Sequence, residues 1–487
     1  MGIIYPGING INGKVVSRSL DYANRDEARA GDPATKKPLK PEEAVDLVGY
    51  MRPLSGRASA EGGSNNTETM TPLRTEQWYA ANKNKSPGYV IANDYSDGSG
   101  AAANDDAALT VALATAIAQN KALLISRPFK FTSEKLVNGI VKISGADGVR
   151  ATLTATAAMR SFFNVTSGAA QVDNFYCDGS NLAQAGIRVE KGHDNLDVKL
   201  SRLDIVKMTQ DGIAWIDGDM PIFTDIRTVN VPVALNFYNN GMNGTIRGLY
   251  ALGGMGLKIS RNASAPVPFQ MEGTDFHGIR ILPSDTATTA GVLIEAGLAL
   301  RFFGLLCDQI YRGFGVRIIG TAASPVDDIQ IFGIWCGGGA SPDPSTIGFS
   351  VAGVARNIQA RGGSVCGFPS YGAVWNGTPG VADQDGNLFE GVKFFNNGCD
   401  LLMAYSRGAL MYNRFESAAS GVYEVTGNET VGIGNYFKTG PQQINATSQY
   451  IMSRGPGAMT GIPLSSTGLN AGKLWRDGSA GGAVKII

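Results

Sequence analysis

The sequence has no excess of charge of either sign. Its 487 residues include 42 basic and 42 acidic side chains, so the formal net charge at pH 7 is zero. A neutral chain has no long-range field that would draw it to nucleic acid or to an anionic membrane surface. We therefore expect no nucleic-acid partner, and we expect any other partner to be recognised by a local site.

The sequence also lacks a long hydrophobic run and a leader. It has no stretch of about 18 apolar residues that could span a bilayer. The N-terminus "MGIIYPGINGINGKVVS" lacks the charged-then-apolar order of a secretory signal. Gly2 is present, but Pro6 stands where a myristoylation motif has Ser or Thr. We expect a soluble, unprocessed chain with no membrane insertion.

Residues that hold metals and cofactors are scarce. There are only two histidines, and the five cysteines, at positions 177, 307, 336, 366 and 399, show neither CxxC nor Cys/His metal spacing. An odd number of cysteines cannot pair completely, so we interpret them as small buried residues. No glycine-rich phosphate loop, Ser/His/Asp triad or calcium loop is convincing. We predict no metal and no cofactor.

Glycine and small apolar residues are abundant instead. The chain has 64 glycines and only 17% charged residues, as expected for an all-β protein with many turns. A small residue followed by apolar, any and apolar residues recurs ten times between 186 and 424, at spacings of 21 to 35 residues. These units are "GIRV", "GIAW", "ALNF", "GLKI", "GVLI", "GVRI", "GFSV", "GAVW", "DLLM" and "GVYE".

A second series of ten units alternates with the first. Its members are "VDNFYC", "LSRLDI", "FTDIRT", "IRGLYA", "MEGTDF", "FFGLLC", "IFGIWC", "ARGGSV", "FEGVKF" and "YNRFES". Their third residues, from 174 to 414, recur every 23 to 31 residues. Short strands at this period predict a parallel β-helix whose turns stack about 4.8 Å apart. A propeller, the alternative, needs about four strands per blade and a period of 40 or more.

Residue composition and local sequence pattern divide the chain into four regions. Residues 1–90 carry charge runs and two short helical patterns, which predict a small attachment or oligomerisation region. Residues 91–150 hold the start of the β-helix and a helix over 105–119, with Asp105 or Asp106 as its N-cap. Residues 151–440 form about ten turns, and 441–487 form a loop-like C-terminal region with a short hairpin.

The stretch "NDYSDGSGAAANDDAALTVALATAIAQNKALLISRPFKFTS", residues 93–133, resembles the N-terminal end of pectate-lyase-like right-handed parallel β-helices. Together with "MTPLRT" and the C-terminal "AGKLWRDG", the arrangement is similar to a bacteriophage tailspike or tail fibre protein. The usual Gly-Gly-x-Val and Pro-x-Gly-x-Tyr strands are replaced by "ALLISRPFKFTS". The resemblance implies a homotrimer in the phage tail of the virion. Its N-terminal region would attach to tail or baseplate proteins, and the trimer would bind, and often cleave, a host surface polysaccharide.

Alternation predicts which side chains of the second series point outward. If the third residue of each unit is a bend, the residue before it and the residue two after it face solvent. The first outward column then contains Arg247, Glu272, Phe303, Phe332 and Arg361. The second outward column contains Tyr250, Asp275, Leu306 and Trp335. In this register Asp308 lies one turn above His277.

Exposed rings beside carboxylates and arginines are typical of a sugar-binding surface. We predict substrate contacts from Arg247, Tyr250, Phe303, Phe332, Trp335 and Arg361. Glycosidic hydrolysis generally uses two carboxyl groups, so Glu272, Asp275 and, third, Asp308 are the catalytic candidates.

Other interpretations remain open. The acid pair is also compatible with an ordinary solvent face, and Glu190 with Glu295 is another possible acid site. A polysaccharide lyase could use Tyr250 beside Arg247. A receptor-binding or structural tail protein of the same fold would have no enzymatic activity.

Overall fold

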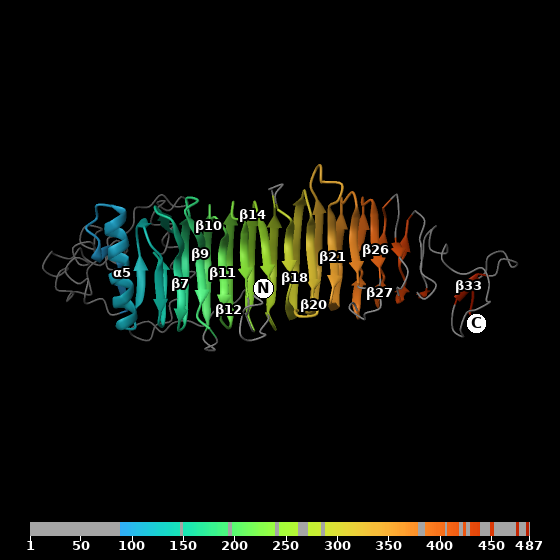
Figure 1. Cartoon of the computed structure of the whole chain (residues 1–487), viewed down its shortest axis with the longest axis horizontal. Helices are drawn as coiled ribbons and strands as arrows, with labels where there is room; N and C mark the ends of the chain where they lie inside the picture. The colour runs from blue at the N-terminus through green and yellow to red at the C-terminus, as the bar shows by residue number, and fades with distance from the viewer. Residues whose placement is uncertain are drawn as a thin grey trace, which may run out of the picture. The chain divides into compact units, whose positions relative to one another are not determined.

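The computed structural model describes residues 88–146, 150–192, 197–238, 243–261, 271–283, 288–377, 385–404, 407–417, 422–424, 429–438, 449–451, 474–476 and 484–486. The predicted attachment region and most of the C-terminal region lie outside these residues. The described chain is a parallel β-solenoid, which confirms the predicted fold class (Figure 1).

One sheet contains every unit of the first series. It has 12 parallel strands, and its first two precede the first predicted unit. In spatial order they are β4 (Lys135–Asn138), β7 (Met159–Ser167), β9 (Ala183–Glu190), β11 (Asp211–Asp217), β13 (Val233–Phe237), β15 (Met255–Ile259), β17 (Ala290–Ile294), β19 (Phe314–Gly320), β21 (Ile347–Gly353), β23 (Tyr371–Asn376), β26 (Cys399–Ala404) and β29 (Val422–Glu424).

The other large sheet is a parallel sheet of 20 shorter or bent strands. Its members are β1 (Tyr89–Ile91), β2 (Ala122–Ile125), β3 (Phe129–Phe131), β5 (Val141–Gly145), β6 (Ala151–Ala155), β8 (Ala170–Asp178), β10 (Val198–Val206), β12 (Pro221–Val229), β14 (Thr245–Leu252), β16 (Asp275–Leu282), β18 (Gly297–Ile310), β20 (Val326–Gly338), β22 (Ala355–Cys366), β24 (Asn387–Glu390), β25 (Lys393–Phe395), β27 (Arg407–Met411), β28 (Arg414–Phe415), β30 (Glu429–Ile433), β31 (Tyr436–Phe437) and β32 (Gln449–Ile451). Near the C-terminus β33 (Leu474–Arg476) pairs antiparallel with β34 (Val484–Ile486).

A helix covers the N-terminal end of the solenoid. After β1 and the 3-10 helix η1 (Ala92–Tyr95), α5 (Ala102–Ala118) packs against the first strands (Figure 1). It buries a face of alanines and leucines that includes Leu109 and Leu113. A solenoid end exposes an apolar cross-section, and this face of α5 removes it from water.

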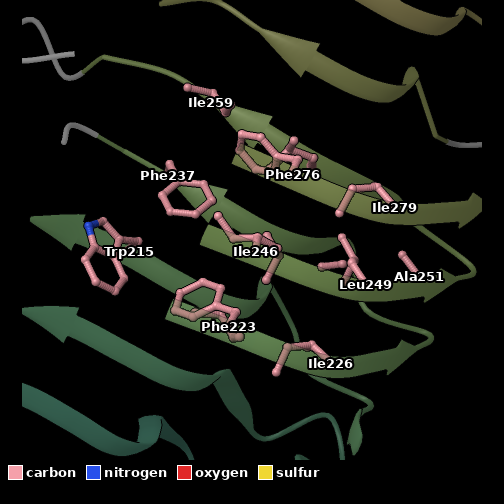
Figure 2. Close-up of a cluster of buried hydrophobic side chains, with 14 of the residues drawn as sticks. Trp215, Phe223, Ile226, Phe237, Ile246, Leu249, Ala251, Ile259, Phe276 and Ile279 are labelled. Atoms are coloured by element: carbon pink, nitrogen blue, oxygen red, sulfur yellow. The ribbon is translucent and has the colours of Figure 1, made fainter. Parts of the chain in front are cut away.

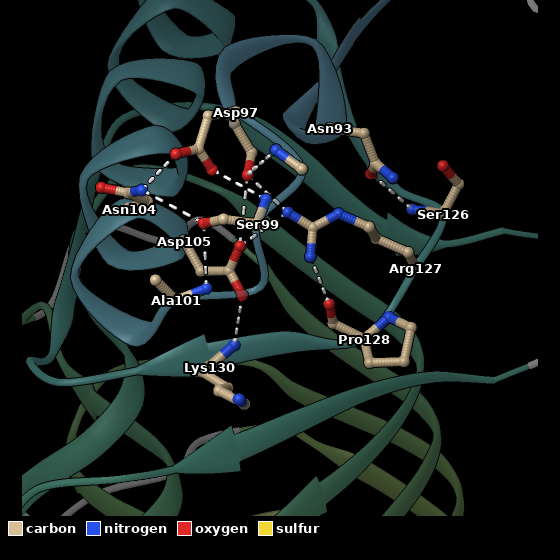
Figure 3. A network of polar contacts seen from close by, with 12 residues as sticks. Asn93, Asp97, Ser99, Ala101, Asn104, Asp105, Ser126, Arg127, Pro128 and Lys130 are labelled. Atoms are coloured by element: carbon tan, nitrogen blue, oxygen red, sulfur yellow. Dashed lines mark hydrogen bonds and ion pairs between the residues drawn. The ribbon is translucent and has the colours of Figure 1, made fainter.

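The predicted N-cap of this helix is wrong. The structure places the N-cap at Ala101, with no side-chain capping bond. Asp105 instead lies 2.6 Å from Arg127 and accepts a hydrogen bond from the backbone of Lys130 (Figure 3). One of the two aspartates was expected to cap the helix. Both instead fasten the helix to the strands, and Asp106 does so through the Lys135 ammonium, which lies 2.7 Å away.

The core explains why the two series keep the same phase. Large apolar side chains from both sheets meet inside the solenoid, Trp215, Phe223 and Phe237 among them (Figure 2). In several first-series units, those that begin with Gly186, Gly212, Gly315 and Gly348, the small residue leaves room for an inward side chain of the second series. A Cβ atom on Gly315 would lie 2.1 Å from the Cys336 Sγ. All five cysteines are free, and the prediction that they are buried is confirmed for four of them, since Cys366 is half-buried.

Candidate functional site

The second series bends once per turn, at a residue with left-handed backbone geometry. The bend residues have φ between +51° and +73°. They are Asn174, Arg202, Asp225, Gly248, Gly278, Gly304, Gly333, Gly362, Gly391 and Tyr412. The prediction located eight of these ten positions.

The prediction placed the fifth bend at Gly273, but strand pairing shows that it lies at Gly278. Phe276 pairs with Ile246 and with Phe302, so His277 takes the place predicted for Glu272, and Arg280 takes that of Asp275. Gly273 is also a left-handed bend, with φ +59°, but it belongs to an earlier corner of the turn. Two corners with the same backbone requirement produced the error of five residues.

The tenth bend is corrected by two residues in the same way. Leu410 and Met411 pair with Phe389 and Glu390, so the bend is Tyr412 rather than Arg414. The buried Asn413, predicted to face outward, donates a hydrogen bond to the Phe389 carbonyl at 2.9 Å. Its place in the first outward column belongs to Met411.

Three rings stack along the first outward column. The His277 and Phe303 ring centroids lie 4.7 Å apart with 12° between the planes. Phe303 and Phe332 follow at 5.2 Å and 9°. We call these three residues the ring column. Phe303 is 37% exposed, which confirms its predicted outward orientation.

A second apolar column runs beside the ring column. Leu306 pairs with Trp335 on the far side of the bends, and Trp335 is 39% exposed. Between the two columns the bends at Gly278, Gly304, Gly333 and Gly362 carry no side chains, and a Cβ atom added there would meet nothing within 4 Å. Asn, Arg, Asp and Tyr occupy the same bend elsewhere, so left-handed geometry alone does not require glycine in four successive turns. This glycine strip lets a ligand approach the backbone closely.

Polar groups border the ring column at both ends. On one side Arg247 pairs in register with His277, and Tyr250 with Arg280. On the other side Arg361 follows Phe332, with its Nε 3.5 Å from a Glu390 carboxylate oxygen. The structure thus brings the predicted binding residues Arg247, Tyr250, Phe303, Phe332, Trp335 and Arg361 onto neighbouring turns of one surface.

A hollow of about 420 Å³ lies further along the same sheet. Leu388 and Met411 contribute apolar lining, and Gln359 contributes an amide. Asp385 and Arg407, which are 3.9 Å apart, contribute charged groups to its lining. The Arg361 guanidinium donates to the Gln359 side chain at 2.9 Å, which links the hollow to the end of the ring column.

The catalytic candidates Glu272 and Asp275 lie on either side of the bend at Gly273. Met271, Thr274 and Phe276 are fully buried, whereas Glu272 is exposed and Asp275 is half-buried. Asp275 lies two residues before His277 on β16, and its Oδ1 is 3.8 Å from Arg301 on the next turn. Asp275 therefore lies on the strand that carries His277, whereas Glu272 precedes the Gly273 bend, and both occupy different columns from those predicted.

Asp308, the third candidate, does not lie above His277. The residue above His277 is Phe303, and Asp308 is five residues further along β18. A Cβ atom on Gly337 would lie 2.3 Å from the Asp308 carboxylate and 3.2 Å from the Trp335 indole nitrogen. Asp308 therefore lies on the Trp335 side of the bends, away from the acid pair.

The alternative acid Glu190 belongs to a polar network on the first-series sheet. Despite partial burial, hydrogen bonds from Arg188 and Asn164, with the nearby Arg160 charge, lower the pKa of Glu190 to about 2. Its carboxylate lies 2.8 Å from Arg160. A carboxylate neutralised in this way is suited to holding strands together. Glu295 is separate, 3.9 Å from Lys258.

His277 and Arg280 are the two residues of this surface that sequence reasoning did not place in the outward columns. The signal was present, because "FHGIRI" has the same apolar, outward, glycine, apolar order as "FFGLLC". Within the described ranges, no group of three or more His, Cys, Asp or Glu is arranged to hold a metal ion. In that same part of the chain, no helix is long and apolar enough to cross a membrane.

Comparison with known proteins finds likeness only among solved structures. No protein-family model and no curated protein matches the chain. The bacteriophage CBA120 tailspike protein 3 aligns over 98% of this chain and 77% of its own, with 11% identity and a TM-score of 0.46. The A-module of the Azotobacter vinelandii mannuronan C-5 epimerase AlgE6 aligns over 76% and 99%, with 12% identity and a TM-score of 0.42. The catalytic unit of a GH87 alpha-1,3-glucanase from Streptomyces thermodiastaticus aligns over 74% and 70%, with 13% identity and a TM-score of 0.42.

Proposed function

We propose that this chain is a bacteriophage tailspike that binds a bacterial surface polysaccharide on the outer surface of β16, β18 and β20. The observation that carries the proposal is the ring column beside Leu306 and Trp335. Stacked rings present flat apolar faces to the C–H faces of pyranose units, and the bordering arginines donate hydrogen bonds to sugar oxygens.

The assembly follows from the sequence resemblance. In this proposal three chains form the tailspike, residues 1–90 attach it to phage tail or baseplate proteins, and the protein resides in the virion. The ligand bound at the ring column is capsule, O-antigen or exopolysaccharide of the host.

We further propose that the bound glycan is depolymerised by hydrolysis, with Glu272 and Asp275 as the two carboxyl groups. Asp275 lies two residues before His277 on β16, and Glu272 lies across the Gly273 bend from it. Hydrolysis requires one carboxyl group to protonate the leaving oxygen and the other to act as base or nucleophile. Asp308 is retained as a third candidate acid next to Trp335.

The test is cleavage of surface polysaccharide extracted from bacteria that the protein binds. We expect new reducing ends with the wild-type chain. We expect a loss of at least about a hundredfold in Glu272→Gln and Asp275→Asn with binding retained, since general acid–base catalysis contributes this much. Glu390→Gln, an acid on the same face, is the control. Full activity in both acid variants removes this pair, and no cleavage of any bound glycan leaves a binding protein.

A second candidate function is elimination on an acidic glycan, and one observation favours it. Tyr250 and His277, two groups able to transfer protons, lie next to Arg247 and Arg280 in adjacent turns. In elimination, a base removes the proton at C5, the C4–O bond breaks with its electron pair passing to the leaving oxygen, and an acid protonates that oxygen. The product is unsaturated at C4–C5, so its ultraviolet absorbance distinguishes elimination from hydrolysis in the same assay.

A further inference from the structure

We propose that the glycan bound at the ring column is acidic, and that Arg247 and Arg280 form a subsite for its carboxylate groups. This inference rests on the proposed function and names the class of its substrate.

Most arginines near this sheet have a carboxylate nearby. Such pairs join Arg150 with Asp204, Arg202 with Asp173, Arg301 with Asp275, Arg361 with Glu390, Arg407 with Asp385 and Arg414 with Glu416. Arg247 and Arg280 are exposed, and within the described part of the chain neither forms an ion pair or a hydrogen bond. The same is true of two other exposed arginines, Arg227 and Arg356. Of these four arginines, Arg247 and Arg280 are the two that border the ring column.

The two guanidinium groups lie on neighbouring turns. Arg247 pairs with His277 before the bends, and Arg280 pairs with Tyr250 after them. Adjacent turns are about 4.8 Å apart. The bends between these side chains are Gly248 and Gly278, which carry no side chains, and the backbone at Gly278 is open. Both cations can therefore reach one group bound over this end of the glycine strip.

The local charge favours an anion. Asp225, the bend residue of the preceding turn, lies beside Gly248, with its Oδ1 2.9 Å from the position that a Cβ atom on Gly248 would take. Three arginines on these turns are exposed, Arg227, Arg247 and Arg280, whereas Asp275 on β16 already lies 3.8 Å from Arg301. A guanidinium group presents paired N–H donors that match the two oxygens of a carboxylate, so the subsite suits a uronic acid or another carboxylate-bearing sugar.

The experiment is binding to an array of bacterial surface polysaccharides grouped as neutral, carboxylated and phosphorylated. We expect the wild-type chain to bind carboxylated glycans. Arg247→Gln and Arg280→Gln together should weaken that binding by about tenfold or more, because each substitution removes charged hydrogen bonds to the carboxylate. Arg356→Gln, an exposed arginine at another corner of the turn, is the matched control and should bind as wild type.

A second measurement separates recognition of the carboxylate from general attraction. The carboxyl groups of the best-bound glycan are reduced to alcohols, and affinity is measured for wild type and for the double variant. If the arginines bind the carboxylate, the two changes are not additive, and the double variant binds the reduced glycan as well as wild type does.

The outcomes separate this inference from the proposed function. Binding of neutral or only phosphorylated glycans that is lost in Trp335→Ala overturns the carboxylate subsite and leaves the glycan-binding surface intact. Additive effects of reduction and substitution also overturn it. Failure to bind any glycan on the array contradicts both the inference and the proposed function.

Discussion

Trp335 leaves 39% of its surface exposed, whereas Trp215 and Trp375 are almost completely buried. The two buried indoles contribute to folding through the apolar area that they remove from water. Trp335 lies outside the core beside Leu306, so its ring remains available to a ligand. Exposure of a large ring therefore distinguishes the candidate binding residues from the core.

We predict that Trp335→Ala weakens glycan binding by about fivefold without changing the melting temperature, since stacking on an exposed ring contributes about 1 kcal/mol. Tyr412→Ala is the control, because Tyr412 is 63% exposed but lies beyond the ring column. Calorimetric titration and thermal unfolding of both variants measure the effects. An unchanged affinity in Trp335→Ala would show that the glycan binds elsewhere.

Asp400 has a different role, because it is a fully buried carboxyl group. It accepts hydrogen bonds from the Asn397 side chain and the Ser417 backbone, each at 3.0 Å. Burial outweighs these bonds and raises the pKa of Asp400 from 3.8 to about 6. The folded state thus binds this proton more tightly than the unfolded state does.

The sign of the pH dependence follows. The stability contributed by protonated Asp400 is present below pH 3.8 and is lost as the pH rises through about 6. Over this range the free energy of unfolding of the wild type should fall by about 3 kcal/mol relative to Asp400→Asn. Chemical unfolding of both proteins between these pH values measures the difference. Parallel pH profiles would contradict the prediction.

At the scale of the strand and its bend, the glycines have two distinct roles. Gly278, Gly304, Gly333 and Gly362 adopt left-handed geometry on the outside of the bend. Gly256, Gly315 and Gly348 do not have positive φ, and side chains of the other sheet fill the space beside them. The first role leaves bare backbone for a ligand, and the second keeps the two strand series in register.

The packing role can be tested at one contact. Gly315→Ala should destabilise the chain by about 1–3 kcal/mol, because the new Cβ overlaps the Cys336 Sγ. Cys336→Ala in the same chain makes room for the methyl group and should restore part of the loss. Unfolding midpoints of the single and double variants give the coupling. Purely additive losses would show that Gly315 is required for another reason.

At the scale of the whole solenoid, stability depends on contacts between neighbouring turns and on covered ends. α5 covers the N-terminal end, and Asp105 and Asp106 fasten it to β3 and the residues that follow. The unit of folding therefore includes the helix together with the first turns.

We predict that Leu109→Asp detaches α5 and exposes the apolar end, so that the protein aggregates. Leu109 is fully buried, and an unpaired charge at that position is costly. Val111→Asp, on the 52% exposed side of the same helix, is the control and should remain soluble. Light scattering during heating compares the two. Equal behaviour would mean that the helix does not protect the solenoid end.

The sequence alone determined the solenoid and most of its outward surface. The interleaved series located eight of ten bends, and Phe303, Phe332 and Trp335 were correctly assigned to adjacent turns. These features are periodic, since each turn must repeat the same apolar, outward and bend positions. The spacing of residues in the sequence therefore predicts the bends and the outward residues of each turn.

Tertiary structure decided the register of the fifth turn. It thereby decided that His277 and Arg280, rather than Glu272 and Asp275, occupy the two outward columns. "MEGTDFHGIR" contains two left-handed glycines, Gly273 and Gly278, and both fit a bend between apolar residues. Only pairing with β14 and β18 selects Gly278, which moves Glu272 and Asp275 to another corner and puts His277 under Phe303. Spacing cannot make that choice, because backbone geometry is alike at both corners and only the neighbouring turns distinguish them.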